Sequence, residues 1–241
     1  MTAARGAVVA VGHRGDPYRV RENTLPSVRS ALERGADAVE VDVRVTCDGV
    51  PVLLHDSSLE RLWGHDRRVT DVTDAELRTL TRGGVPTLHE VLLAPRPVGD
   101  ARLMIDLPGA TTATVRAVVG TVRECGAAER VYYCAGAEAM LAVRAADPGA
   151  EIAMTWQSLA PPRPVLLEAV RPRWLNYRFG LVSRELTERV HGDGLLVSAW
   201  TADTGRSMRR LVGAGVDSIT TNRIDTLANL LRTGRPVPPK A

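Results

Sequence analysis

Short apolar runs alternate with amphipathic segments along almost the whole chain. Apolar runs of four to eight residues between turn residues predict buried strands, and apolar residues spaced three to four apart predict helices. Nine runs have the character of strands: 7–12, 38–45, 50–55, 101–107, 130–134, 151–156, 174–177, 195–200 and 218–221. Six segments have the period of helices: 24–34, 112–124, 138–145, 184–191, 205–214 and 225–231.

This repeated alternation of strand and helix predicts one mainly parallel sheet. The glycine-rich patterns G-x-G-x-x-G and G-x-x-x-x-G-K-[ST] are absent, which weakens a nucleotide-binding, doubly wound arrangement. The alternation continues to the C-terminus of a chain of 241 residues, close to the roughly 250 residues of a typical α/β barrel. We therefore predict a TIM-type (β/α)8 barrel of the α/β class. It should be slightly irregular, because the chain has nine strand-like runs and the barrel needs eight, so one run is extra.

The chain shows no linker or break in composition that would divide it into domains. We predict one barrel domain over residues 1–234 and a flexible, proline-rich tail over 235–241. The longest stretch without a clear strand is 57–86, which we expect to form a loop or small helical excursion within the same domain.

Composition narrows the class of protein. A hydrophobic share of 44% and a charged share of 24% are typical of a soluble globular protein and exclude a disordered chain. No run approaches the roughly 18 apolar residues of a membrane span, and the run 7–11 is too short for a signal-peptide core. We therefore expect a cytoplasmic protein that does not insert into membranes. Three cysteines without C-x-x-C spacing argue against a disulfide framework.

The basic residues are almost all arginine. Of 31 basic residues, only Lys240 is a lysine, so a role usually given to lysine must fall to arginine or to no residue. Dispersed arginines, a net charge of +3 and few aromatic residues argue against nucleic-acid binding and mildly favour an anionic small-molecule substrate.

Ionisable side chains concentrate at the C-terminal ends of the predicted strands, which is where α/β barrels place their active sites. Four of the nine runs end in, or lead into, histidine, arginine or carboxylate residues, and another ends in tryptophan. The residues at these ends are His13, Arg14, Glu40, Asp42, His55, Asp56, Asp106 and Trp200.

The second and third runs predict a hairpin. Asp48-Gly49 is typical of a two-residue type I′ turn, and that turn would place Asp42 opposite His55 on one face. The period of two places Glu40 on the same face. The spacing alone therefore predicts that two carboxylates and a histidine lie together.

Two carboxylates one residue apart, with Asp106 on a neighbouring strand, suit a hard divalent cation. Oxygen ligands favour Mg²⁺ or Ca²⁺ over zinc. The alternative is a solvated strand face, or carboxylates paired with nearby arginines. Two histidines at the same end strengthen a catalytic interpretation, because imidazole exchanges protons near neutral pH.

An ordered set of short motifs resembles the glycerophosphodiester phosphodiesterase family. The resemblance is dense over 12–90, sparse over 110–195, and clear again to about 226. The matching motifs are His13-Arg14-Gly15, Glu22-Asn23-Thr24, Gly35-Ala36-Asp37, Glu40-Val41-Asp42-Val43, Thr46-Cys47-Asp48-Gly49, Pro51-Val52-Leu53-Leu54-His55-Asp56, Pro86-Thr87-Leu88-His89-Glu90, Trp200-Thr201-Ala202-Asp203 and Gly215-Val216-Asp217-Ser218-Ile219-Thr220-Thr221-Asn222.

This resemblance implies a TIM-type barrel that binds Mg²⁺ or Ca²⁺ and cleaves a phosphodiester to sn-glycerol 3-phosphate and an alcohol. By position it implies that three carboxylates hold the metal, namely Glu40, Asp42 and Asp106. It implies that His13 and His55 are the acid–base pair. It also implies that Arg14 contacts the phosphate and that Trp200 forms the wall beside the glycerol.

One position departs from the family pattern. At the position of Asp106 the family more often has glutamate. Two residues later it usually has a lysine beside the phosphate, and this chain has Pro108 there instead. Proline supplies neither charge nor donor. Activity is then weaker, the substrate differs, or an arginine substitutes, and the candidate is Arg178. Two alternatives stay open: a phospholipase-D-like lyase that forms a cyclic phosphate, and a phosphodiester-binding protein without turnover.

Overall fold

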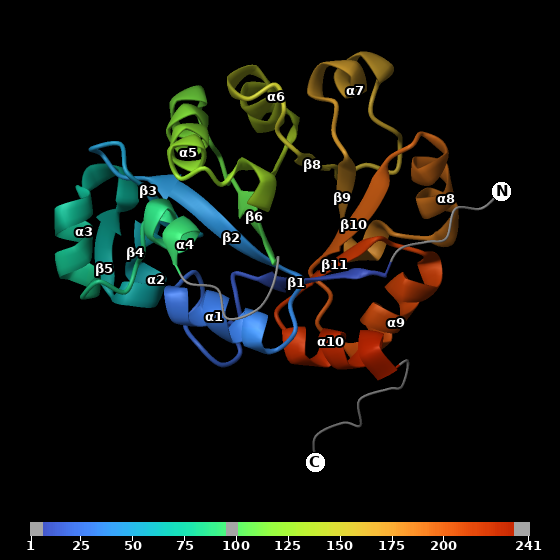
Figure 1. Cartoon of the computed structure of the whole chain (residues 1–241), viewed down its shortest axis with the longest axis horizontal. Helices are drawn as coiled ribbons and strands as arrows, with labels where there is room; N and C mark the ends of the chain where they lie inside the picture. The colour runs from blue at the N-terminus through green and yellow to red at the C-terminus, as the bar shows by residue number, and fades with distance from the viewer. Residues whose placement is uncertain (1–6, 95–100, 234–241) are drawn as a thin grey trace.

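In a computed structural model that describes residues 7–94 and 101–233, eight parallel strands form a closed barrel (Figure 1). The first strand pairs with the second and also with the last, which closes the ring. In order around the barrel they are β1 (Val9–His13), β2 (Ala38–Val45), β6 (Arg102–Asp106), β7 (Val131–Ala135), β8 (Ile152–Thr155), β9 (Trp174–Arg178), β10 (Leu196–Trp200) and β11 (Ser218–Thr221). The TIM-type barrel predicted from the sequence is confirmed.

Helices surround the barrel (Figure 1). They are α1 (Leu25–Glu33), α4 (Leu88–Leu93), α5 (Thr112–Glu124), α6 (Ala137–Ala146), α7 (Pro164–Val170), α8 (Arg184–Gly192), α9 (Gly205–Ala214) and α10 (Ile224–Thr233). At the start of α1, α5, α8 and α9 a serine or threonine oxygen accepts a hydrogen bond from a backbone N–H of the first turn. None of the helices in the described ranges has the length and apolar character needed to span a bilayer.

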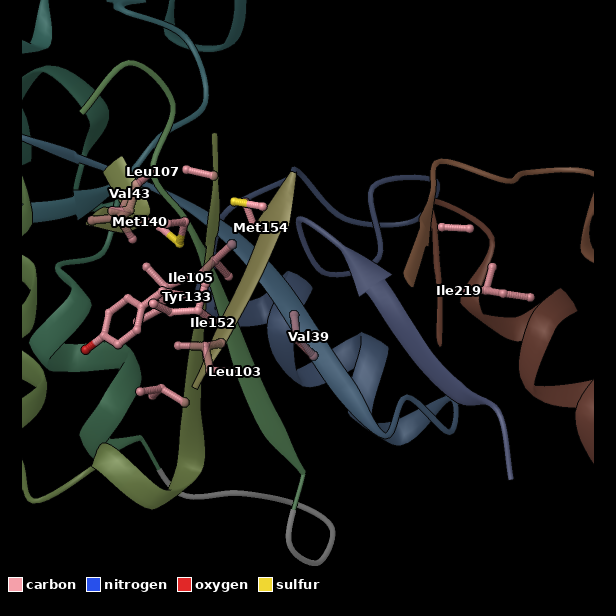
Figure 2. Packing of buried hydrophobic residues seen from close by; sticks show 14 of the residues in the cluster. Val39, Val43, Leu103, Ile105, Leu107, Tyr133, Met140, Ile152, Met154 and Ile219 are labelled. Atoms are coloured by element: carbon pink, nitrogen blue, oxygen red, sulfur yellow. The ribbon is translucent and has the colours of Figure 1, made fainter. Parts of the chain in front are cut away.

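The strands present one set of side chains to the helices and the other to the barrel interior. Val39, Val41 and Val43 of β2 belong to the outer core, and Figure 2 shows Ile105 and Tyr133 from neighbouring strands in the same layer. Burial of a large aliphatic side chain contributes about 1.5–3 kcal/mol. This outer layer therefore supplies most of the apolar burial and leaves the later inward positions of β2, from Glu40 on, free for polar side chains.

A smaller apolar cluster fills the barrel interior. Its members include Val11, Ala38 and Met104, each of which lies two residues before a predicted site residue on the same strand. Because successive side chains alternate, that spacing places the cluster directly beneath the polar residues at the strand ends. The interior packing thus forms the floor on which the candidate site stands.

The ninth predicted run is the extra one: β3 (Pro51–Leu53) lies outside the barrel and pairs antiparallel with β2. The predicted hairpin register is wrong by one residue, since Val43 pairs with Leu53 rather than with the residue after it. The turn has three residues, because the Thr46 N–H donates to the carbonyl of Val50 and Gly49 takes the left-handed position with φ of 88°.

The 57–86 excursion contains more regular structure than its sequence predicts. It holds β4 (Ser58–Leu59), α2 (Glu60–Trp63), β5 (His65–Arg68), a 3₁₀ turn η1 (Val69–Asp71) and α3 (Asp74–Thr81). β4 and β5 form a separate two-stranded antiparallel sheet, and β5 reads His-Asp-Arg-Arg, without the apolar alternation that signals a strand. The predicted tail, 235–241, lies outside the described residues.

Candidate active site

Strand register brings the predicted site residues to one end of the barrel. His13 of β1 is the register partner of Glu40 on β2, and Asp42 is the partner of Asp106 on β6. A cavity of about 300 Å³ opens at these strand ends. Its lining includes His13, Arg14, Glu40, Asp42, His55, Asp106, Pro108 and Trp200.

A second hollow, about 430 Å³, lies between α1 and α4. Its wall is formed largely by aliphatic side chains such as Leu32 and Leu103. It contains none of the site residues predicted from the sequence. The barrel-end cavity is smaller, but it holds the convergent charged groups that identify a reactive site.

Three carboxylates form the centre of this cavity. Oxygen atoms of Glu40, Asp42 and Asp106 all lie within 4.8 Å of one another. Burial, together with the charges of the other two carboxylates, raises the pKa of Glu40 well above its ordinary value. Burial and the charge of Asp42 raise the pKa of Asp106 to about 7. A trio of close, buried carboxylates fits a hard divalent cation, which would relieve this repulsion.

Arg14 supplies part of the compensating positive charge. Its backbone N–H donates to Glu40 Oε2 at 2.8 Å, and its guanidinium Nε lies 3.2 Å from Asp42 Oδ2. The tight turn behind it depends on Gly15, which has φ of 89°. A Cβ at that position would lie 2.2 Å from Ser27 Oγ, so glycine is required by both conformation and space.

His13 is held by a chain of hydrogen bonds that determines its tautomer. The Asn222 side-chain amide donates to Asp203 Oδ2 at 2.8 Å, and a carboxylate only accepts. Asn222 Oδ1 therefore faces His13 Nδ1, at 2.7 Å, and accepts its proton. His13 Nε2 is left with its lone pair. Burial, followed by the charge of Arg14, lowers the pKa of His13, so the ring stays neutral near pH 7.

His55 also lines the cavity, but it has a different partner. It is in the bend after β3 rather than on the strand, so it is not opposite Asp42 as the predicted register required. Its Nδ1 lies 2.7 Å from Asp56 Oδ1. A hydrogen bond from Arg61 lowers the pKa of Asp56 to about 2, and the resulting anion holds Nδ1–H of His55.

Several residues with contacts to the site were not identified from the sequence. Asn23 donates to Asp42 Oδ2 at 2.8 Å and accepts the Asp42 N–H, which fixes that carboxylate. Asn222 and Asp203 orient His13 as described above. All three lie within the motifs that resemble the family, and these motifs were the sequence signal that could have identified them. Position at a strand end does not single them out.

Arg178, the candidate to replace the family's lysine, does not line the cavity. It is an exposed residue at the end of β9. Its register partner on β10 is Trp200, which does line the cavity. Arg178 therefore stands at the rim, beside the tryptophan, while Pro108 occupies the wall itself.

Comparison with known proteins agrees with this geometry. The model of the glycerophosphoryl diester phosphodiesterase family matches residues 13–226. A glycerophosphodiester phosphodiesterase of Caldanaerobacter subterraneus subsp. tengcongensis is 30% identical over 247 residues, which cover 94% of this chain and 98% of the relative. A relative from Mycobacterium tuberculosis is 29% identical over 254 residues, which cover 94% and 91% of the two chains.

Solved structures share the fold. A glycerophosphodiester phosphodiesterase from Thermotoga maritima superposes with a TM-score of 0.78 at 25% identity, covering 92% of this chain and 98% of that one. A phosphodiesterase of Oleispira antarctica, solved with the product sn-glycerol-3-phosphate, has a TM-score of 0.81 at 21% identity and covers 94% and 98%. The match over most of the chain shows that this protein belongs to the glycerophosphoryl diester phosphodiesterase family and is a phosphoric diester hydrolase.

Proposed function

We propose that this protein hydrolyses glycerophosphodiesters to sn-glycerol 3-phosphate and an alcohol in a metal-dependent reaction that uses His13 and His55 as acid–base groups. The observation that carries the proposal is the cluster of three buried carboxylates in one cavity with both histidines. At about 300 Å³ the cavity is at the small end of ligand sites, which supports a small-molecule phosphodiester over a polymer such as nucleic acid. A cytoplasmic location is part of this proposal.

The cation of this proposal would be held by Glu40, Asp42 and Asp106, and the all-oxygen donor set suits Mg²⁺ or Ca²⁺. When bound, such an ion supplies charge neutralisation at a phosphoryl oxygen and orientation of the nucleophile. Arg14 would contact the phosphate, because its Nε and Nη1 face Asp42 and Glu22 while Nη2 has no partner within the described ranges. A fixed guanidinium suits this contact because its donors are planar and always charged.

The two histidines suit opposite roles in proton transfer. His13 is neutral and presents the lone pair of Nε2, so it would accept a proton from water or from a neighbouring hydroxyl of the substrate. His55 is held through Nδ1 by the anionic Asp56, so in this proposal its other ring nitrogen, Nε2, would donate a proton to the leaving alkoxide. Trp200, on the wall of the cavity, would bound the glycerol side.

The rim arginine is part of the same proposal. Arg178 would reach the phosphate from beside Trp200 and replace the charge that Pro108 does not supply. A second arginine is also near: Arg44 follows Asp42 on the same face of β2, and its Nε donates to the carbonyl of His55 at 2.8 Å. Arg44 Nε thus supports the position of His55.

A panel of glycerophosphodiesters, assayed with Mg²⁺, Ca²⁺ or EDTA, tests the proposed function. The expected result is release of glycerol 3-phosphate that stops in EDTA and is lost in His13→Ala and in His55→Ala. Phosphorus NMR of the product separates hydrolysis from a lyase reaction, which would yield a cyclic phosphate. Ligand binding without any product would instead identify a binding protein.

A further inference from the structure

Arg61, on the short helix α2 of the 57–86 excursion, contacts two carboxylates from different loops. Its Nε lies 2.5 Å from Asp56 Oδ2, and its Nη2 lies 2.7 Å from Glu22 Oε1. Each carboxylate has a second partner at the site. Asp56 holds His55 Nδ1 at 2.7 Å, and Glu22 accepts from Arg14 Nη1 at 2.9 Å. The contacts form one continuous chain from His55 to Arg14.

We propose that Arg61 is a positioning residue that fixes His55 through Asp56 and Arg14 through Glu22, and so sets the distance between the proposed acid and the proposed phosphate contact. This inference rests on the proposed function, since it takes the roles of His55 and Arg14 from there. Within the described ranges, Arg61 is the residue that touches both carboxylates.

The chemistry of the guanidinium suits this task. Its donors lie in one rigid plane, so two carboxylates bound to it are fixed relative to each other, which a flexible ammonium does not achieve. The network also persists over the neutral range, because hydrogen bonds from Arg61 help to hold the pKa of Asp56 at about 2 and to lower that of Glu22.

A role in overall stability explains these contacts less well. The Arg61 side chain is 46% exposed, and exposed ion pairs contribute little to folding. The helix α2 has no fully buried residue. Loss of Arg61 should therefore leave the fold intact while it loosens the two loops that carry His55 and Glu22.

The chain offers a matched control in the same excursion. Arg78 of α3 also bridges two carboxylates, Asp74 at 2.9 Å and Glu90 at 3.0 Å. Its side chain is 42% exposed, close to the value for Arg61. Among the described residues, no hydrogen bond or ion pair joins Asp74 or Glu90 to a residue that lines the barrel-end cavity. Arg78→Ala therefore removes the same kind of double ion pair without disturbing the site.

The test compares the wild type with Arg61→Ala, Arg61→Lys and Arg78→Ala. We expect Arg61→Ala to lower kcat/KM by about 10- to 100-fold, the usual effect of losing a group that orients site residues, while its melting temperature stays close to that of Arg78→Ala. Lysine can restore only one of the two contacts, so Arg61→Lys should recover part of the activity. Arg78→Ala should match the wild type.

Variants that remove one of the two carboxylate contacts of Arg61 separate a positioning role from a general structural role. Asp56→Asn should lower kcat, because it releases His55, whereas Glu22→Gln should raise KM, because it releases Arg14. Arg61→Ala should show both effects. A uniform loss that follows melting temperature in all three variants would contradict the proposal.

Histidine ¹⁵N NMR gives a readout that does not depend on activity. The neutral ring of His55 should be held as Nδ1–H in the wild type and in Arg78→Ala, and as a mixture of tautomers in Arg61→Ala. An inactive wild type with this NMR pattern would refute the proposed function and leave the positioning role standing. An active wild type, with Arg61→Ala equal to Arg78→Ala in both kinetics and NMR, would overturn the positioning role itself.

Discussion

Replacement of Asn222 by leucine tests whether the hydrogen-bond chain from Asp203 makes His13 a base. The side-chain volume is roughly kept, but Oδ1, which accepts the Nδ1 proton of His13, is removed. Asp203 keeps the N–H of residue 222 and the hydroxyl of Thr221 as partners, so the change acts mainly on the imidazole.

The expected magnitude follows from the cost of a buried donor without a partner. In Asn222→Leu the Nδ1–H form of His13 loses its acceptor, a loss of about 1–3 kcal/mol. The other tautomer does not use Asn222 Oδ1 as an acceptor, and its Nε2–H would be on the side of Glu40, whose Oε2 lies 3.9 Å from Nε2. The ratio of the Nδ1–H tautomer to the other tautomer should therefore fall by roughly 5- to 150-fold, because about 1.4 kcal/mol corresponds to tenfold in an equilibrium constant.

The assay is kcat/KM for a glycerophosphodiester at pH 8, together with ¹⁵N NMR of His13 to read the tautomer. Asn229→Leu is the matched control, since Asn229 is another partly exposed asparagine in the same C-terminal region and its side chain lies outside the cavity. Unchanged activity and an unchanged tautomer in Asn222→Leu would show that the hydrogen-bond chain from Asp203 does not make His13 a base. A loss of activity without a tautomer shift would contradict that role equally.

Three further predictions concern the carboxylates, the turn and the rim. The pKa of Asp106 is about 7 in the folded protein, against 3.8 for an ordinary aspartate, so protonation of this carboxyl favours the folded state. The metal-free wild type should therefore lose stability relative to Asp106→Asn as pH rises from about 4 to 7. Urea unfolding measures this difference, and the opposite slope would contradict the prediction. Gly15→Ala should destabilise the protein by more than about 1 kcal/mol, because its Cβ meets Ser27; an unchanged urea midpoint would count against the turn geometry. Arg178→Met should lower kcat/KM, with recovery in the double variant that also carries Pro108→Lys, and normal activity in the single variant would exclude Arg178 as the substitute cation.

The barrel could be predicted because its signal is local and repeated. Each strand is a short apolar run, and most helices have a clear period, so Ala38–Val45, Thr112–Glu124 and Gly205–Ala214 have the predicted bounds. The helices α4 and α7, of six and seven residues, are too short to show that period. β5 is polar along its whole length, so nothing in its pattern distinguishes it from a loop.

The site was predictable to the extent that it follows strand ends. The principle that barrels place chemistry there located His13, the carboxylates and Trp200 without any contact information. His55 was expected near them through a hairpin register that is wrong, and it lines the cavity because the bend after β3 turns it inward. The three-residue turn is closed by hydrogen bonds between Thr46 and the backbone of Val50. The Asp-Gly pair of the sequence does not distinguish this turn from a two-residue turn.

The supporting residues could not be located from spacing. Asn222 is 209 residues from His13 in sequence, and Arg61 is 39 residues from Glu22. Such pairs meet only because the barrel closes and the excursion folds back toward the β1–α1 loop. Their contacts depend on tertiary structure, which local pattern does not encode.

In the proposed function, catalysis depends on a divalent cation held by the carboxylates of Glu40, Asp42 and Asp106. The most direct test is the kcat/KM of a variant that carries Glu40→Ala and Asp42→Ala, measured over a range of Mg²⁺ concentrations beside the wild type. We expect saturable activation of the wild type by Mg²⁺, abolished by EDTA, and no activation of the variant at any concentration. Full activity of the variant, or a wild type indifferent to EDTA, would contradict it.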